Sequence, residues 1–235
     1  MLWGMTLSTP SLPYGELGRL LSLMTGDEKH APSATSTLDV LWVLYDQVLR
    51  VSPSTMGDPE RDRFVLSKGH GPMAYYAVLA AKGFVPLAEL KRFGAYDALL
   101  GHHPDRVLVP GVEVGSGSLG HGLPIAVGMA LGLRIQERFR PRVAVLLGDA
   151  ELDEGSNHEA IAVAGRLGLD SLTAIVIDNQ SASHGWPGGI AARFSAEGWH
   201  AQTVSGRDHA ALARALTLPR DGRPQAVVAT VEPKW

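Results

Sequence analysis

Two continuous apolar runs with a helical segment between them constrain the fold of this chain more than any other feature. Residues 143–147 (VAVLL) and 172–177 (LTAIVI) are rich in β-branched and aliphatic residues and carry no charge. Residues 159–167, between them, repeat apolar side chains at helical spacing. This pattern is typical of parallel strands that helices cover on both faces. It predicts an α/β fold with a doubly wound, mainly parallel sheet flanked by helices.

The same alternation continues along the rest of the chain. Short apolar runs predict strands over residues 64–66, 202–204 and 225–231. Helical spacing predicts helices over residues 38–49, 73–79, 123–139 and 208–216, with Ser36 or Thr37 as the N-cap of the first. We expect a single domain over residues 30–235, preceded by a leader and a first helix within residues 1–29.

Composition excludes several classes of protein. Hydrophobic residues make up 45% of the 235 residues and charged residues 19%, as in folded globular proteins. The net charge of −3 provides no basic surface for nucleic acid. The chain has no cysteine, which excludes disulfides, cysteine nucleophiles and thiolate zinc sites. It has neither a secretory signal nor the ~20 apolar residues of a membrane helix, so we expect a cytoplasmic protein.

Polar residues directly follow both central strands. Gly148, Asp149 and Ala150 follow the first, and Asn179 follows the second, 30 positions after Asp149. Ligands of such sheets bind beyond the carboxyl ends of the strands, so the two side chains should meet at one edge. Carboxylate and carbonyl oxygens suit magnesium, and a helix that begins near Gly155 would offer N–H groups to phosphate. Either residue alone could simply end a strand or cap a helix. The pair at this spacing favours a site.

The pattern resembles the magnesium–diphosphate motif of thiamine-diphosphate enzymes, which begins Gly-Asp-Gly and ends in Asn about thirty residues later. Longer segments are similar to the amino-terminal domain of the transketolase family. They are HAPSATSTLDVLWVLYDQVL from His30, RDRFVLSKGHGPMAYYAVLAAKG from Arg61, GHHPDRVLVPGVEVGSGSLGHGL from Gly101 and GDAELDEGSNHEA from Gly148. The resemblance covers residues 30 to 231 in one order.

The family resemblance implies a role for each matching position. Thiamine diphosphate and Mg²⁺ are the implied cofactors. Asp149, Asn179 and the backbone carbonyl of Ser181 would hold the metal. The cofactor itself would contact Gly117, Leu119, Gly148, Asp149, Ala150, Asn179 and His70. His30, His70 and His103 would act on the donor substrate, and Glu154 would couple cofactors across a subunit interface.

Several positions depart from the family pattern. Ala150 replaces the second glycine of Gly-Asp-Gly, which is tolerable only if the φ angle of Ala150 is negative. His102, His121 and Ser181 also replace the usual residues. The family's second, pyrimidine-binding domain, which supplies the activating glutamate, does not fit within 235 residues. We therefore expect the partner to be a separate carboxy-terminal subunit, the assembly a heterotetramer, and the substrates small molecules.

Three other interpretations stay open. The enzyme could use a 2-oxo acid donor or an unusual acceptor instead of transferring a two-carbon ketol unit from a ketose-type donor. The chain could also be a non-catalytic scaffolding subunit. Finally, residues 115–120 (GSGSLG) match the Gly-x-Gly-x-x-Gly pattern of dinucleotide sites, although residues 107–111 form a poor preceding strand.

Overall fold

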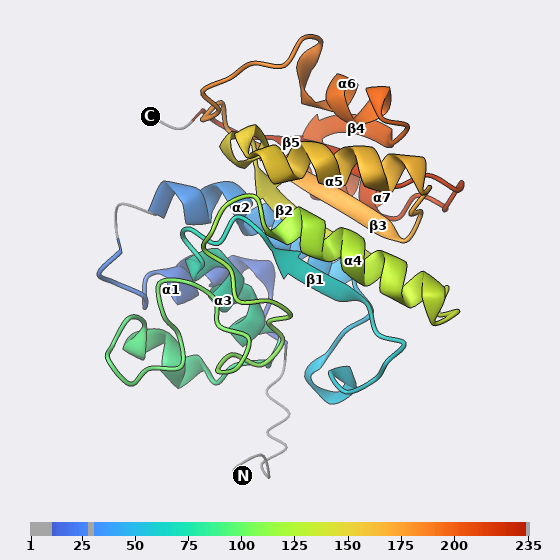
Figure 1. The fold of residues 1–235 in the computed structure, drawn as a ribbon. Helices are drawn as coiled ribbons and strands as arrows, with labels where there is room; N and C mark the ends of the chain where they lie inside the picture. The colour runs from blue at the N-terminus through green and yellow to red at the C-terminus, as the bar shows by residue number, and fades with distance from the viewer. Residues whose placement is uncertain (1–10, 28–30, 234–235) are drawn as a thin grey trace.

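The part of the chain that the structure describes contains one sheet of five parallel strands. The computed structural model describes residues 11–27 and 31–233. Its strands are β1 (Arg63–Leu66), β2 (Val143–Gly148), β3 (Leu172–Asp178), β4 (His200–Ser205) and β5 (Gln225–Thr230). Their order across the sheet is β1-β2-β3-β5-β4 (Figure 1). The α/β prediction with a parallel sheet is confirmed.

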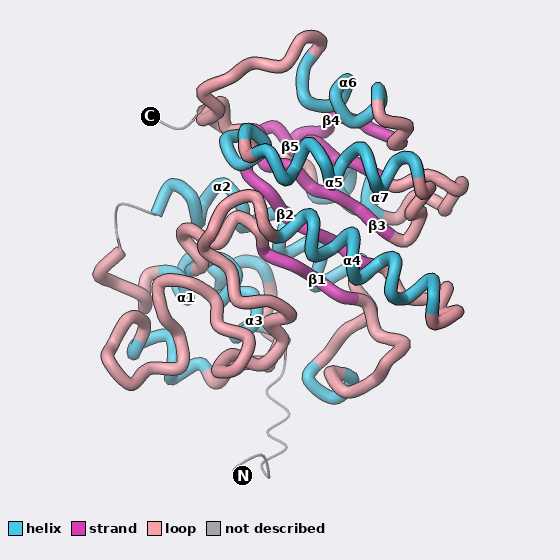
Figure 2. The backbone as a smooth tube through the Cα atoms, viewed as in Figure 1, coloured by secondary structure: helices cyan, strands magenta, loops and turns pink. Residues whose placement is uncertain are grey.

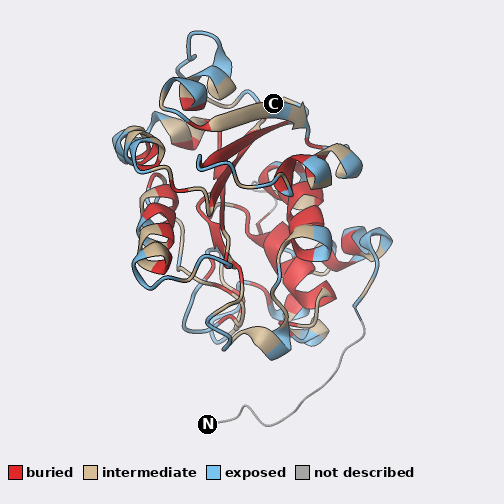
Figure 3. Cartoon of the chain, turned by 90° about the vertical axis from the view of Figure 1, so that its right-hand side faces the viewer, coloured by how far each residue is buried: buried red, intermediate tan, exposed pale blue. Residues whose placement is uncertain are grey.

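Helices cover both faces of the sheet. One face carries α1 (Leu17–Leu21), α2 (Ala31–Val43), α3 (Met73–Ala81) and α7 (His209–Leu216), and the other carries α4 (Gly122–Ile135), α5 (Gly155–Arg166) and α6 (Gly189–Ala196). In a view turned by 90°, the buried sides of these helices face the sheet from left and right (Figure 3). The shorter helical turns are Tyr14–Glu16, Leu44–Val48, Pro53–Thr55, Leu87–Arg92 and Ala150–Asp153. No helix among the described residues is long and apolar enough to cross a membrane.

The strand sequences explain the two cores. Successive side chains of a strand point to opposite faces, so a run such as VAVLL must be apolar throughout when both faces are covered. In β2, Ala144 and Leu146 belong to the core beneath α2 and α3. Val143, Val145 and Leu147 belong to the core beneath α4 and α5. The two apolar sets are separated only by the sheet, which makes the molecule a three-layer sandwich.

Strand register brings the candidate residues to one edge. Gly148, the last residue of β2, pairs with Ile177 of β3. Asp149 therefore lies beside the end of β3, just before Asn179. Figure 2 shows the long loops gathered at this carboxyl edge, beyond the ends of β1, β2 and β3.

Three local predictions were wrong. The helix predicted from residue 38 begins at Ala31, so Ser36 and Thr37 lie inside it and bond back to the Ser33 carbonyl. Proline at position 32 is compatible with this earlier start, because a first-turn N–H needs no helical partner. The helix predicted to reach residue 139 ends at Ile135, and Glu137 turns to a φ of 57°. Helix α6 was not predicted.

Candidate functional site

Asp149 is a buried carboxylate surrounded by donors. Its side chain accepts hydrogen bonds from Ala150 N at 2.9 Å, Ser181 N at 2.6 Å, Ser181 Oγ at 2.6 Å and Ala182 N at 3.2 Å. The residue is only 2% exposed. Burying a charge is tolerable only when hydrogen bonds or a cation compensate it, and these four donors do so here. The loop after β3 is thereby tied to the end of β2.

Asn179 lies at the neighbouring strand end. It follows β3 directly, is 4% exposed, and precedes Gln180, whose φ of 56° turns the chain toward Ser181. Its side chain makes no hydrogen bond with any residue that the structure describes, whereas Asp149 and Ser181 contact one another. The structure thus brings the three predicted metal-ligand residues to one edge.

The chemistry of this edge fits a magnesium–diphosphate group. Within residues 11–27 and 31–233, no group of three or more His, Cys, Asp or Glu side chains could hold a metal by itself. One carboxylate, one amide and a backbone carbonyl leave most of a magnesium shell to water and phosphate oxygens, which is how this ion usually binds. A cation at Asp149 must replace at least one of its four donors. The Ser181 hydroxyl can rotate away, because it is the one donor on a single side-chain bond.

Ala150 tolerates its side chain at this edge, and Gly148 lies against Lys68. The positive-φ residues other than glycine are Glu137 and Gln180 among those described, so Ala150 meets the requirement that its φ not be positive. A Cβ atom at Gly148 would lie 3.4 Å from the side chain of Lys68. The Lys68 ammonium donates to Ser33 Oγ at 2.7 Å and Ser36 Oγ at 3.1 Å, which anchors the segment after β1 to α2.

His70 and His103 lie together at the same side. Their rings meet edge to face with centroids 5.4 Å apart. Gly117, at a φ of 144°, is packed so closely that a Cβ atom there would be 2.5 Å from the His103 ring. A Cβ at Gly69 would be 2.6 Å from the Gly117 nitrogen. A Cβ at either glycine would collide with atoms already in place, so residues 68–70, residues 116–120 and the His103 ring pack in direct contact; we call this close approach, which only glycine permits, the glycine cradle.

A buried hydroxyl lies beside this cradle. Ser116 Oγ is buried without a hydrogen-bond partner in the described part of the chain, and it would be 2.7 Å from a Cβ at Gly69. An unsatisfied buried hydroxyl costs free energy, so its presence marks a place where a bound group could supply the acceptor. The unpaired Ser116 hydroxyl fits a cofactor bound beside residues 68–70 and 116–120.

Glu154 and Leu119 lie farther along the same loops. Glu154 is the exposed N-cap of α5, and its Cβ would be 2.6 Å from a Cβ at Gly120. The Leu119 carbonyl lies 3.1 Å from Nδ1 of His121. An exposed carboxylate at this position is free to meet another subunit. His30 lies outside the described residues.

Sequence reasoning missed one buried acid in the middle of the site. Glu151 is 1% exposed, and its carboxylate accepts from Ser67 Oγ, from Gly120 N at 3.0 Å and from Gly148 N at 3.3 Å. Burial raises the pKa of Glu151, and the donated hydrogen bonds offset part of that rise. Nothing in the acidic run ELDE distinguishes it from a surface residue.

One pocket adjoins these segments and a second lies apart from them. The first, of about 300 Å³, is lined by residues that include Asp149, Ala182, Trp186, His158 and Arg193. Arg193 stacks 4.1 Å from the Trp186 ring centre and lies 2.8 Å from Nδ1 of His158.

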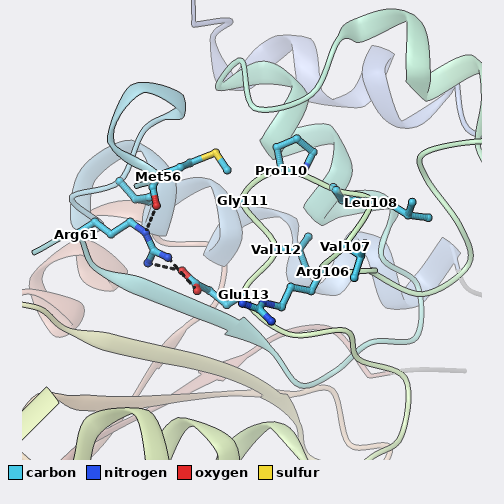
Figure 4. Close-up of a pocket in the computed structure, with 11 residues that line it drawn as sticks. Met56, Arg61, Arg106, Val107, Leu108, Pro110, Gly111, Val112 and Glu113 are labelled. Atoms are coloured by element: carbon cyan, nitrogen blue, oxygen red, sulfur yellow. Dashed lines mark hydrogen bonds and ion pairs between the residues drawn. The ribbon is translucent and has the colours of Figure 1, made fainter. Parts of the chain in front are cut away.

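The other pocket, of about 290 Å³, lies between residues 51–61 and 106–113 (Figure 4). The Arg61–Glu113 ion pair, at 2.5 Å, crosses its wall. It contains none of the predicted site residues, so we assign the site to the carboxyl edge instead.

Comparisons with known proteins find relatives along most of this chain. The family model described as "Transketolase, thiamine diphosphate binding domain" matches residues 19–231. A protein of Rhodococcoides fascians named "Ferredoxin fas2" is 58% identical over 218 residues, which cover 93% of this chain and 72% of that protein. One subunit of the apulose-4-phosphate transketolase of Actinobacillus succinogenes is 35% identical, with 85% of this chain and 75% of that protein covered.

Solved structures that match this chain share its fold. The transketolase from Leishmania mexicana matches with a TM-score of 0.73 and 28% identity. The match covers 88% of this chain and 37% of that one. This chain therefore spans little more than a third of that solved transketolase.

Proposed function

Because this chain belongs to the family of transketolase thiamine-diphosphate-binding domains, we propose that it is the diphosphate-binding subunit of a two-chain transketolase-like enzyme. The enzyme would transfer a two-carbon ketol unit from a ketose-type donor to an acceptor. The observation that carries the proposal is the meeting of Asp149, Ser181 and Asn179 at adjacent strand ends, next to the glycine cradle. The absence of cysteine agrees with a cytoplasmic location, which we propose as well.

The proposed cofactors are thiamine diphosphate and Mg²⁺. Asp149, Asn179 and the Ser181 carbonyl would hold the metal, and Gly148 and Ala150 would face the diphosphate. Gly117 and Leu119 would line the cofactor on the side of the 115–120 loop. When bound, thiamine diphosphate supplies the carbanion chemistry that cleaves and forms carbon–carbon bonds.

The chain's own residues would bind and orient the donor. His70 and His103 can donate hydrogen bonds to substrate oxygens, and their edge-to-face contact places the two rings against each other. His30 is proposed as a further contact to substrate hydroxyls. Glu154, exposed at the start of α5, is proposed to contact another subunit.

A separate carboxy-terminal subunit with the pyrimidine-binding domain is the proposed partner, in a heterotetramer. The relative from Actinobacillus succinogenes supports this, since its name makes it one subunit of a transketolase. The name ferredoxin does not transfer to this chain, because a chain without cysteine offers no thiolates for an iron–sulfur cluster.

The proposal is tested by calorimetric titration of thiamine diphosphate with Mg²⁺ into the chain, alone and with its carboxy-terminal subunit. We expect magnesium-dependent binding that tightens with the partner and disappears in Asp149→Ala. Asp153→Ala is the matched control, because Asp153 is an exposed acid in the same short turn. Equal binding by the Asp149→Ala variant would contradict the site.

Two alternatives have distinct outcomes in a reconstituted pair. Turnover of a 2-oxo acid but not of ketoses would identify a related enzyme with a different donor. Association without cofactor binding or turnover would identify a scaffolding subunit.

A further inference from the structure

The Glu151 carboxylate connects three chain segments that the sequence separates. Ser67, at the end of β1, donates its hydroxyl to Glu151, and Gly120 N donates to the same oxygen at 3.0 Å. Gly148 N, at the end of β2, donates to the other oxygen at 3.3 Å. All three partners are donors, which is the set that a carboxylate accepts.

The connection extends to the start of α4. Gly122 N, one of the first amides of α4, donates to Ser67 Oγ at 3.0 Å. A helix leaves its first amides without helical partners, and Ser67 satisfies this one from another element. A Cβ at Gly122 would be 2.3 Å from Ser67, so the approach needs glycine.

The backbone of Glu151 is held in place by helix α5. Asn157 of α5 is fully buried and donates its side-chain amide to the Glu151 carbonyl at 2.6 Å. Glu151 therefore has little freedom to move. Its position in turn constrains the three segments whose groups donate hydrogen bonds to its carboxylate.

Those segments carry most of the proposed cofactor residues. Ser67 precedes Lys68 to His70, Gly120 follows Gly117 and Leu119, and Gly148 precedes Asp149. We propose that Glu151 is a positioning residue that sets the relative placement of these three segments and thereby the affinity for the magnesium–diphosphate group. This inference deepens the proposed function and rests on it.

Glu151→Gln is the test variant, because it keeps the size of the side chain. The glutamine amide must point its N–H groups at one of three donors, so one segment is left without its acceptor. We expect hydrogen exchange to rise at residues 117–122 and 148–150. We also expect the dissociation constant for thiamine diphosphate with Mg²⁺ to increase at least about tenfold, as expected for one buried group left unpaired.

Asp62→Asn is the matched control. Asp62 is also 1% exposed, and it accepts from Arg50 N and Arg142 N, both at 2.8 Å. It lies at the opposite edge of the sheet, just before β1. The control should lose stability while its cofactor affinity stays within about twofold of wild type, because surroundings far from a site couple weakly to it.

Ser67→Ala is a second variant that removes one donor and leaves the carboxylate in place. It should weaken binding in the same direction as Glu151→Gln, and the double variant should be less than additive because both changes act on one network. These measurements use the full chain with its partner subunit.

Binding by Glu151→Gln equal to wild type, or a loss no larger than that of Asp62→Asn, would overturn the inference. A wild-type chain that binds no thiamine diphosphate, alone or with the partner, would instead contradict the proposed function. In that case hydrogen exchange still decides the positioning role, since unchanged exchange at residues 117–122 and 148–150 overturns it.

Discussion

At the scale of single residues, the candidate site depends on positions where only glycine fits. Gly117 combines a φ of 144° with a ring atom of His103 only 2.5 Å from any added Cβ. Backbone in this region is strained for every residue except glycine. The position therefore couples backbone shape to the placement of His103.

Gly117→Ala should destabilise the chain by about 1–3 kcal/mol and weaken cofactor binding, because the methyl group must displace His103. Gly115→Ala is the matched control two residues earlier. Its nearest neighbour to an added Cβ is the Pro104 carbonyl at 3.6 Å, an ordinary contact. Thermal unfolding and calorimetric titration of both variants check this prediction, which fails if the two behave alike.

Ser181→Ala separates the backbone of Ser181 from its hydroxyl. We expect magnesium-dependent binding of thiamine diphosphate to stay within about threefold of wild type, because the proposed ligand is the carbonyl and one competing donor to Asp149 is removed. Calorimetric titration beside Asp149→Ala measures this. A loss as large as that of Asp149→Ala would assign the hydroxyl to the metal site.

At the scale of elements, the central strands β2 and β3 were predictable because a parallel strand that is covered on both faces is apolar throughout. The run 143–147 sits between two covered faces, so every residue is apolar and the period of two disappears. Helix α6 was missed because it has only eight residues, follows Gly188 at a φ of 78°, and spreads small apolar residues around its surface, so that no single apolar face stands out. Its placement comes from packing: Phe194 is fully buried against Trp199 at a ring distance of 5.0 Å.

The contact of α5 with the turn before β4 provides an element-scale prediction. A Cβ at Gly165 would be 1.7 Å from the Glu197 carbonyl, so Gly165→Ala must push these elements apart. We expect it to destabilise the chain by about 1–3 kcal/mol. Gly128→Ala in α4, where no atom lies within 4 Å of the added Cβ, should stabilise it by about 0.5–1 kcal/mol. In urea unfolding, the free energy of unfolding should fall for Gly165→Ala and rise for Gly128→Ala. Changes of the same sign in both variants would contradict the prediction.

A pH-dependent contact ties the amino-terminal helix to α2 and α7. Tyr14 donates to Asp39 at 2.6 Å, and Asp39 also accepts from Arg207 and His209. Burial and the neighbouring Asp39 carboxylate raise the pKa of Tyr14 from 10.0 to about 12. The folded state therefore favours the neutral phenol. This stabilisation is complete below pH 10 and is lost as the pH rises from 10 through 12.

Tyr14→Phe should remove that dependence. Because Tyr14 is 37% exposed, solvent screening limits its contribution, and we expect the wild type to lose about 1 kcal/mol more than Tyr14→Phe across this range. Burial also raises the pKa values of Tyr45, Tyr75 and Tyr76, and these contribute equally to both proteins. Urea unfolding at intervals from pH 9 to pH 12, with Tyr96→Phe as the exposed control, measures the difference between the variants. Parallel pH profiles for wild type and Tyr14→Phe would refute the assignment to Tyr14.

At the scale of the whole molecule, topology explains which parts of the site could be predicted. Asp149 and Asn179 were predictable because each follows a recognisable strand, and adjacent parallel strands end at one edge. Glu151 was not, because its burial depends on Ser67 and Gly120, which are 84 and 31 residues away in sequence. The exposed Asp153 and Glu154 beside it look the same in the sequence.

The stability of the entire chain should depend on the proposed cofactors. A ligand that binds only the folded state stabilises it by mass action, by about 2.7 kcal/mol at a free concentration one hundred times its dissociation constant. Thiamine diphosphate with Mg²⁺ at that concentration should therefore raise the melting temperature by about 5–11 °C for a chain of this size. Either component alone should have a much smaller effect, because the metal and the diphosphate complete each other's contacts at Asp149 and Asn179.

Differential scanning fluorimetry with and without EDTA measures this shift, and Asp149→Ala is expected to abolish it. The partner subunit should enlarge the shift in wild type, since it would complete the proposed binding site. A shift that survives both EDTA and Asp149→Ala would mean that the ligand binds elsewhere, and the carboxyl edge of β2 and β3 would no longer be the candidate site.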